Sequence, residues 1–192
     1  MTDWKDRLVN QLEPILRESD PRPAISAYHD MPFAIFRYPP EEEFAVRQEA
    51  SLLKTRIEQV GKRVTVISLS DCMQEAIAAE GLNPASLIDA EKNVGIEATI
   101  ETIHQILSVY RPLDGVVADH IPKDADPLQD IIFITRAGAL FPIYRTSSLL
   151  EQLKGKVNIP AVLFYPGELD GATGLRFMGI LDAEHNYRPK IF

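Results

Sequence analysis

Ile131-Ile-Phe-Ile134 and Ala161-Val-Leu-Phe164 are two short runs made only of apolar residues. A strand covered on one face alternates apolar and polar residues, whereas a strand buried on both faces is apolar throughout. The two runs, with a third at Phe177-Met-Gly-Ile-Leu181, therefore predict strands in a sheet that has helices on both sides.

Helix and strand patterns alternate before these runs. Apolar stretches predict strands at 33–36 and 64–69, and residues 40–61 predict a helix that begins with Pro40 and three glutamates and ends at Gly61. A first helix is predicted over residues 4–16, with Thr2 as its cap and a kink at Pro14. Ser70 is expected to cap a helix over residues 70–81, and a long helical region is predicted over 84–110. Another helix, capped by Ser147 or Ser148, is predicted to end at Leu153.

This alternation predicts a three-layer α/β domain with an open, mainly parallel sheet flanked by helices. The last predicted strand follows a glycine-rich loop instead of a helix, so we expect it to be antiparallel. No linker or internal repeat interrupts the sequence, and we expect a single domain over residues 1–192.

Composition argues against general DNA-binding, secreted and membrane proteins. The chain has 192 residues and a net charge of −8, which opposes the phosphate attraction on which general DNA binding depends. The N-terminus lacks an apolar signal segment, and the stretches between charges are too short to span a membrane. Cys72, the single cysteine, suits a reducing compartment, so we expect a cytoplasmic protein.

Motifs for nucleotide binding and nucleophilic catalysis are missing from the sequence. It contains no Gly-x-Gly-x-x-Gly, no P-loop and no Gly-x-Ser-x-Gly. Asp119, His120, Asp124, Asp126 and Asp130 could supply metal ligands, but their spacing matches neither an EF-hand loop nor a His-Glu-x-x-His zinc site, and acidic loops are usually solvated. We therefore expect no catalytic residues, no metal and no cofactor.

An anion site is the alternative. Arg136 ends a predicted strand and Arg145-Thr-Ser-Ser148 opens the next helix, so guanidinium and hydroxyl groups could converge on one anion. The simpler interpretation pairs the arginines with acidic residues of this chain and places Ser148 and Glu151 in a capping box. The sequence leaves both open.

The last third of the chain differs in charge and composition. Residues 1–130 carry 23 acidic and 13 basic side chains, whereas residues 131–192 carry 5 and 7. Arginine and tyrosine are enriched at binding hot spots. Phe164 and Phe177 are expected in the core and Phe192 at the surface, and we expect a partner to contact Arg136, Tyr144, Arg145, Tyr165, Tyr187 and Arg188.

The same region resembles the BrxB family of BREX (bacteriophage exclusion) defence systems. The resemblance rests on residues 131–142, Arg145, Leu149-Leu150, Pro160-Ala-Val-Leu-Phe-Tyr-Pro-Gly167, Leu175-x-Phe177 and Asn186-Tyr-Arg188. It implies a small intracellular component of a defence assembly that is encoded beside a PglZ-type alkaline-phosphatase-like protein, an AAA+ ATPase and a DNA methyltransferase. It implies no established enzymatic activity.

Two hypotheses follow. In the first, the chain is a non-catalytic adaptor that binds a larger component of the system. The preferred partner is the PglZ-type protein, and the AAA+ ATPase and the methyltransferase are the other candidates. In the second, it is a small α/β nucleotide- or anion-binding sensor or enzyme that uses Arg136, Arg145 and Ser147, with a metal at Asp119 and Asp124.

Overall fold

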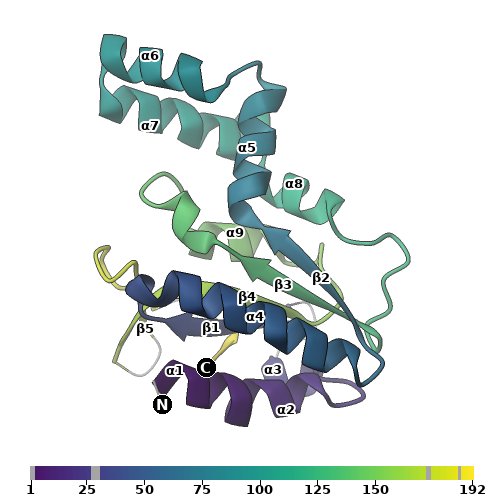
Figure 1. The fold of residues 1–192 in the computed structure, drawn as a ribbon. Coiled ribbons are helices and arrows are strands. Elements are labelled where there is room, and N and C mark those ends of the chain that lie inside the picture. Colours follow the sequence, from purple (N-terminus) through teal and green to yellow (C-terminus); the bar gives the residue numbers. More distant parts are fainter. Residues whose placement is uncertain (1–2, 27–30, 172–173, 186) are drawn as a thin grey trace.

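The computed structural model describes residues 3–26, 31–171, 174–185 and 187–192. Its centre is a six-stranded sheet in the order β2-β3-β4-β1-β6, with β5 paired to β4 (Figure 1). The strands in this order are parallel to their neighbours. They are β1 (Phe33–Tyr38), β2 (Arg63–Ser68), β3 (Asp130–Thr135), β4 (Ala161–Asp170) and β6 (Lys190–Ile191).

The predicted α/β class and mainly parallel sheet are confirmed. The predicted antiparallel strand also exists, but it is β5 (Gly174–Phe177), which pairs with the end of β4, instead of a strand over 177–181. Phe177 ends β5 because Met178 has a φ of 55°, which turns the chain out of the sheet.

One face of the sheet is covered by the N-terminal helices and α4. These elements are α1 (Asp3–Arg7), a π-helical turn (Leu8–Leu12), α2 (Glu13–Leu16), α3 (Arg22–Ile25), a 3-10 turn (Pro40–Glu42) and α4 (Glu43–Glu58). The π-helical turn ends at Leu12, two residues before Pro14, whose missing N–H removes one hydrogen bond from the helical ladder. Thr2, the predicted cap, lies outside the described residues.

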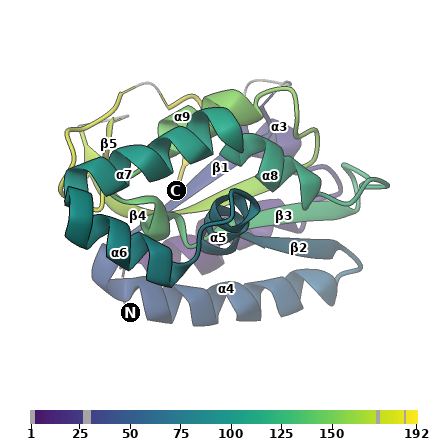
Figure 2. The same cartoon turned by 90° about the horizontal axis from the view of Figure 1, so that it is seen from above.

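The opposite face carries α5 (Leu69–Ala79), α8 (Leu113–Asp119), α9 (Thr146–Leu153) and the end of α7 (Ile96–Gln105), which continues into a π-helical turn (Ile106–Tyr110). A 3-10 turn (Ala137–Leu140) follows β3. In the view from above, these helices overlie the sheet, while α6 (Pro84–Val94) and α7 lie side by side (Figure 2).

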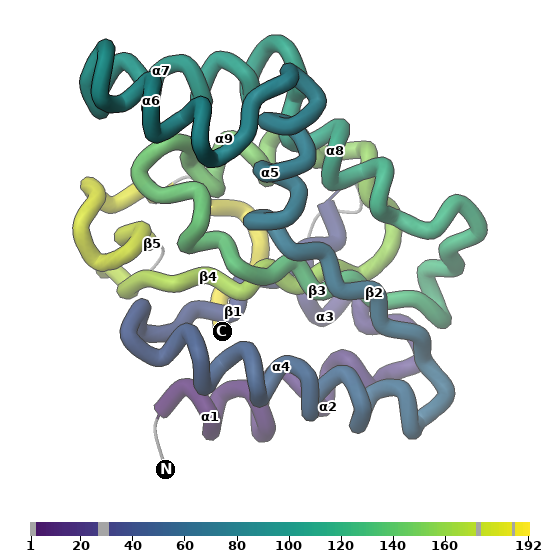
Figure 3. The backbone as a smooth tube through the Cα atoms, turned by 45° about the horizontal axis from the view of Figure 1, so that its top comes forward, coloured from purple at the N-terminus to yellow at the C-terminus, as the bar shows by residue number. Residues whose placement is uncertain are grey.

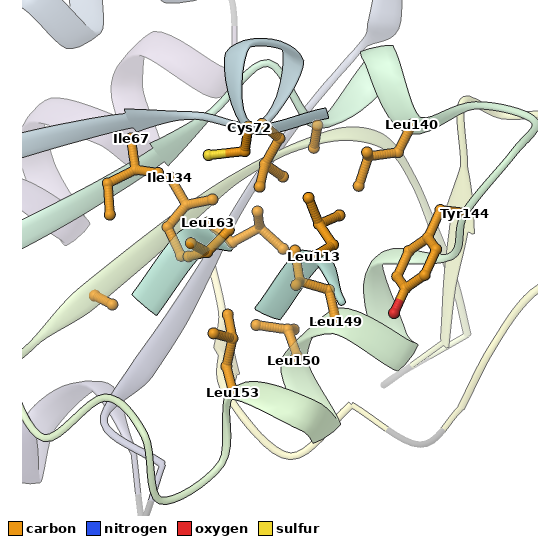
Figure 4. Packing of buried hydrophobic residues seen from close by; sticks show 14 of the residues in the cluster. Ile67, Cys72, Leu113, Ile134, Leu140, Tyr144, Leu149, Leu150, Leu153 and Leu163 are labelled. Atoms are coloured by element: carbon orange, nitrogen blue, oxygen red, sulfur yellow. The ribbon is translucent and has the colours of Figure 1, made fainter. Parts of the chain in front are cut away.

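The pleat of the strands divides the core in two. On β3, Ile132 and Ile134 face the cluster beneath α5, α8 and α9, whereas Ile131 and Phe133 face the cluster against α4. Figure 4 shows the first cluster, in which Leu149, Leu150 and Leu153 of α9 approach Leu163 of β4. Both faces of the sheet are therefore buried, as the apolar runs predicted.

Three local predictions are wrong. Ser68 caps α5, not Ser70, because Ser68 is extended and accepts a hydrogen bond from the Asp71 N–H, while Ser70 lies inside the helix. Arg145 occupies the N-cap position of α9 without a side-chain cap, so neither Ser147 nor Ser148 caps that helix. The helical region 84–110 is interrupted at Gly95, whose φ is 90°.

Helix placement creates a topological switch point. The connection after β1 runs through α4 on one face, whereas the connections after β2 and β3 run through helices on the other. In open α/β sheets, ligands bind outside the carboxyl ends of strands where the connections part in this way. The carboxyl ends of β1, β3 and β4 are therefore the first place to search.

Candidate functional site

A cleft of about 330 Å³ lies at these carboxyl ends. Its wall on the side of β1 comes from Pro40, Glu43 and Arg47, and its wall on the side of β3 from Arg136, Gly138 and Ala139; Pro166 of β4 and Met178 complete it. Small-molecule sites have volumes from roughly 300 to 1,000 Å³. We call it the carboxyl-edge cleft.

Backbone strain is concentrated in this cleft. Arg136 (φ 58°) and Met178 (φ 55°) are the non-glycine residues with positive φ in the described part of the chain, and both line the cleft. Such conformations cost free energy and often occur at functional sites. The Arg136 side chain donates from Nη1 to Oδ1 of Asp71 at 3.3 Å.

The other wall carries a chain of polar groups. The hydroxyl of Tyr38 donates a hydrogen bond to the carboxylate of Glu43, and burial together with this carboxylate raises the pKa of Tyr38. Arg47 Nε lies 3.7 Å from Oε1 of Glu43, and the guanidinium lies 4.7 Å from the ring centroid of Phe44. Phe44 is 74% exposed.

The predicted partner residues do not form one surface. Tyr144, Tyr165 and Phe192 are buried, so the expectation that they lie at the surface is wrong. The hydroxyl of Tyr144 donates to Oε1 of Gln152 at 2.8 Å, and the Tyr165 ring packs between those of Phe177 and Tyr187, at centroid distances of 5.4 and 5.9 Å. Burial raises the pKa of the Tyr165 hydroxyl. These three aromatic side chains stabilise the fold.

Tyr187 and Arg145 meet at Glu184. Tyr187 is half-buried, its hydroxyl lies 3.2 Å from Oγ1 of Thr146 and 3.2 Å from Oε2 of Glu184, and Arg145 forms an ion pair with the same carboxylate. Burial opposes ionisation of Glu184, but hydrogen bonds from Ser147, Arg145 and Tyr187 outweigh it and lower its pKa. The network ties the C-terminal segment to α9.

The anion site suggested by the sequence does not form, because Arg136 and Arg145 do not line the same pocket. Arg136 lines the carboxyl-edge cleft, whereas Arg145 lines a separate shallow depression that already contains Glu184. Both arginines pair with acidic residues of this chain, as the simpler interpretation held. Its capping box is absent, because α9 has no side-chain cap. Arg188 is exposed.

The possible metal ligands of the acidic loop, residues 119–130, do not gather at one point either. Asp130 is buried and held by Arg63, with Nε to Oδ1 at 2.8 Å, while His120 Nε2 lies 2.8 Å from Oε2 of Glu75. Within the described residues, no three side chains of the metal-binding types gather at one point. Burial, with Glu75 and Asp71 nearby, raises the pKa of Cys72 to about 11, so its thiol stays protonated at neutral pH.

A helical arm projects from the body (Figure 3). It consists of α6 and α7, and none of the residues of α6 is buried. Ile88, Val94 and Ile96 are exposed apolar residues on the arm, the last two beside the turn at Gly95. At its base, Nδ1 of His104 lies 3.0 Å from the carbonyl oxygen of Ile143, so the arm is anchored two residues before Arg145.

Comparison with known proteins gives one consistent answer. The family model described as BREX protein BrxB matches residues 65–191. The chain belongs to the BrxB family. A BREX protein BrxB of Bacillus cereus (strain H3081.97) is 30% identical over 162 residues, which cover 83% of this chain and 82% of that relative. BrxB membership indicates a role in BREX phage defence.

No solved structure matches the chain. Among the described residues, no helix combines the length and the apolar character that crossing a membrane requires.

Two features of the chain were not predicted from the sequence. Glu43, Phe44 and Arg47 were interpreted only as part of a helix, although they follow the carboxyl end of β1, where an α/β sheet binds ligands. The arm was hidden because the apolar stripe of residues 96–107 continues the helical pattern past Gly95. That glycine inside a long helical pattern was the available signal.

Proposed function

We propose that the chain is a non-catalytic adaptor that docks onto a larger BREX protein, the PglZ-type alkaline-phosphatase-like component. The observation that carries this proposal is the arm: α6 has eleven residues, none of them buried, only its Leu87 packs against the core, and Ile88 and Val94 are exposed to solvent. Exposed apolar groups on a projecting element are typical of protein interaction sites.

The acidic charge of the arm indicates what kind of surface the partner would present. Residues 83–105 contain four acidic residues, Asp89, Glu91, Glu97 and Glu101, but a single lysine, Lys92, and no arginine. The matching surface is therefore an apolar groove with basic residues at its rim. Arg145 and Arg188 stay predicted contacts, and Arg145 lies close to the anchored base of the arm.

The proposed lack of catalysis is supported by the sequence and by the site. The nucleotide and nucleophile-elbow motifs are missing from the sequence, and the Cys72 thiol is buried and protonated. Turnover of a substrate by the purified chain would contradict this part of the proposal.

Co-purification tests the docking surface. Val94→Lys with Ile96→Asp replaces both apolar residues at the tip without changing the net charge, and each new charge suits the helix end on which it lies. We expect this double variant to lose the PglZ-type protein in a pull-down.

The matched control makes the same charge exchange on α4 and just beyond it, with Leu52→Lys and Val60→Asp, at positions that are also exposed. This control should retain the partner. Arg188→Glu should weaken capture less than the tip variant. Retention of the partner by the tip variant, or its loss by the α4 control alone, would overturn the proposed surface.

A further inference from the structure

We propose that the carboxyl-edge cleft binds a nucleoside phosphate, with Arg47 and Arg136 on the phosphate and Phe44 against the base. This inference is independent of the adaptor proposal, because the cleft lies at the end of the sheet and shares no lining residue with the arm.

The two arginines have donors available. A guanidinium carries five N–H donors. Arg136 uses one of them on Asp71 at 3.3 Å, in an exposed pair, which is weak in water. Arg47 lies 3.7 Å from Glu43, beyond hydrogen-bond distance, and its buried Nε has no hydrogen-bond partner among the described residues.

A phosphate satisfies these donors better than the present partners do. Its oxygens accept paired N–H bonds from a guanidinium, and such charge-assisted bonds are roughly twice as strong as neutral ones. The strained backbone of Arg136 keeps its side chain at the edge of the cleft, where it lines the same space as Arg47. An anion between the two arginines would relieve their mutual repulsion.

The remaining groups favour a nucleoside over a bare anion. Phe44 follows Glu43 in α4, its ring lies against the guanidinium of Arg47, which lines the cleft, and 74% of its surface is exposed; aromatic faces stack nucleobases. Glu43 lines the cleft as an acceptor that can accept hydrogen bonds from ribose hydroxyls or base amino groups, which a bare anion lacks. The volume of about 330 Å³ suits one nucleotide better than a dinucleotide.

Gly138 provides a way to fill the cleft without removing a charge. A Cβ atom at this position would lie 3.4 Å from Sδ of Met178 and 3.5 Å from Cγ of Pro166, which is ordinary contact or close to it. A leucine there keeps the backbone and occupies the space of the ligand.

The test is isothermal titration calorimetry of the full chain with AMP, ADP, ATP, adenosine and inorganic phosphate. We expect saturable binding of at least one nucleotide, at least tenfold weaker binding of adenosine and phosphate, and at least tenfold loss in Arg47→Met, Arg136→Met and Gly138→Leu. Arg176→Met is the matched control, because Arg176 forms an exposed ion pair with Asp170 outside the cleft.

Absence of binding for every nucleotide at millimolar concentration would overturn the inference. Binding that is unchanged in both arginine variants would overturn the site, and inorganic phosphate binding as tightly as the nucleotides would overturn the ligand class. If Gly138→Leu is unfolded by circular dichroism, the two arginine variants decide the result.

Discussion

Every residue of β3 is buried, whereas none of the residues of α6 is. The body of the protein therefore uses its apolar side chains to stabilise the fold, as any domain of this size must. On the arm, Ile88, Val94 and Ile96 are each at least half exposed, so they contribute less to folding than the buried residues of the body do. Substitutions in the body should therefore cost more stability than substitutions of the same kind in the arm.

The largest contrast is expected from matched truncations in the body and the arm. Leu163→Ala in β4 removes a fully buried side chain and should lower the free energy of unfolding by about 3 kcal/mol. Val94→Ala should change it by less than about 0.5 kcal/mol, because the side chain is already exposed. Urea denaturation measures both. Equal losses would show that the arm belongs to the cooperative core.

A second contrast compares two charged pairs. Asp130 is buried at the start of β3, and the hydrogen bond from Arg63 lowers its pKa. Asp130→Asn should cost about 2 kcal/mol at pH 7. In the arm, Asp89 and Lys92 are exposed and 4.0 Å apart, so Asp89→Asn should cost less than about 0.5 kcal/mol.

The pH dependence follows from the direction of this shift. A carboxyl whose pKa is lowered by folding stabilises the protein fully above its unfolded pKa, about 3.9, and loses that contribution as the pH falls through the folded pKa. The wild-type chain should therefore lose more stability than Asp130→Asn between pH 5 and the acid limit of folding. Identical pH profiles from calorimetric melting would show that the pair contributes nothing.

The smallest contrast concerns the backbone of Arg136. Arg136→Gly and Arg136→Ala both remove the side chain, but only glycine adopts φ 58° without strain. The glycine variant should be more stable than the alanine variant by about 1 kcal/mol in thermal unfolding. Equal stability of the two variants would indicate that the backbone at position 136 leaves its positive φ once the arginine side chain is removed. The side chain would then be what holds the strained backbone conformation.

The fold was predictable from the sequence where burial alone determines the pattern. Ile131–Ile134 and Ala161–Phe164 can be apolar throughout only if both faces of the sheet are covered, and the structure confirms this. The two-residue strand β6 is too short to leave such a pattern, and α8, with seven residues, is too short to show a helical repeat.

The site was less predictable, for a physical reason. Tyrosine has an apolar ring and a polar end, so composition does not say whether it faces a partner or the core. Tyr165 was expected to contact a partner, but it follows Phe164 in a strand that is covered on both faces, so its side chain is buried on whichever face it lies. Arg47 and Arg136 lie 89 positions apart, and only the strand order brings them to one cleft.

Hydrogen–deuterium exchange of the chain, alone and mixed with the PglZ-type protein, tests the adaptor account most directly. The exposed helix α6 should exchange quickly in the free chain. We expect the partner to slow exchange most strongly in residues 84–105. Unchanged exchange in those residues, with slowing confined to other parts of the chain or absent altogether, would contradict it.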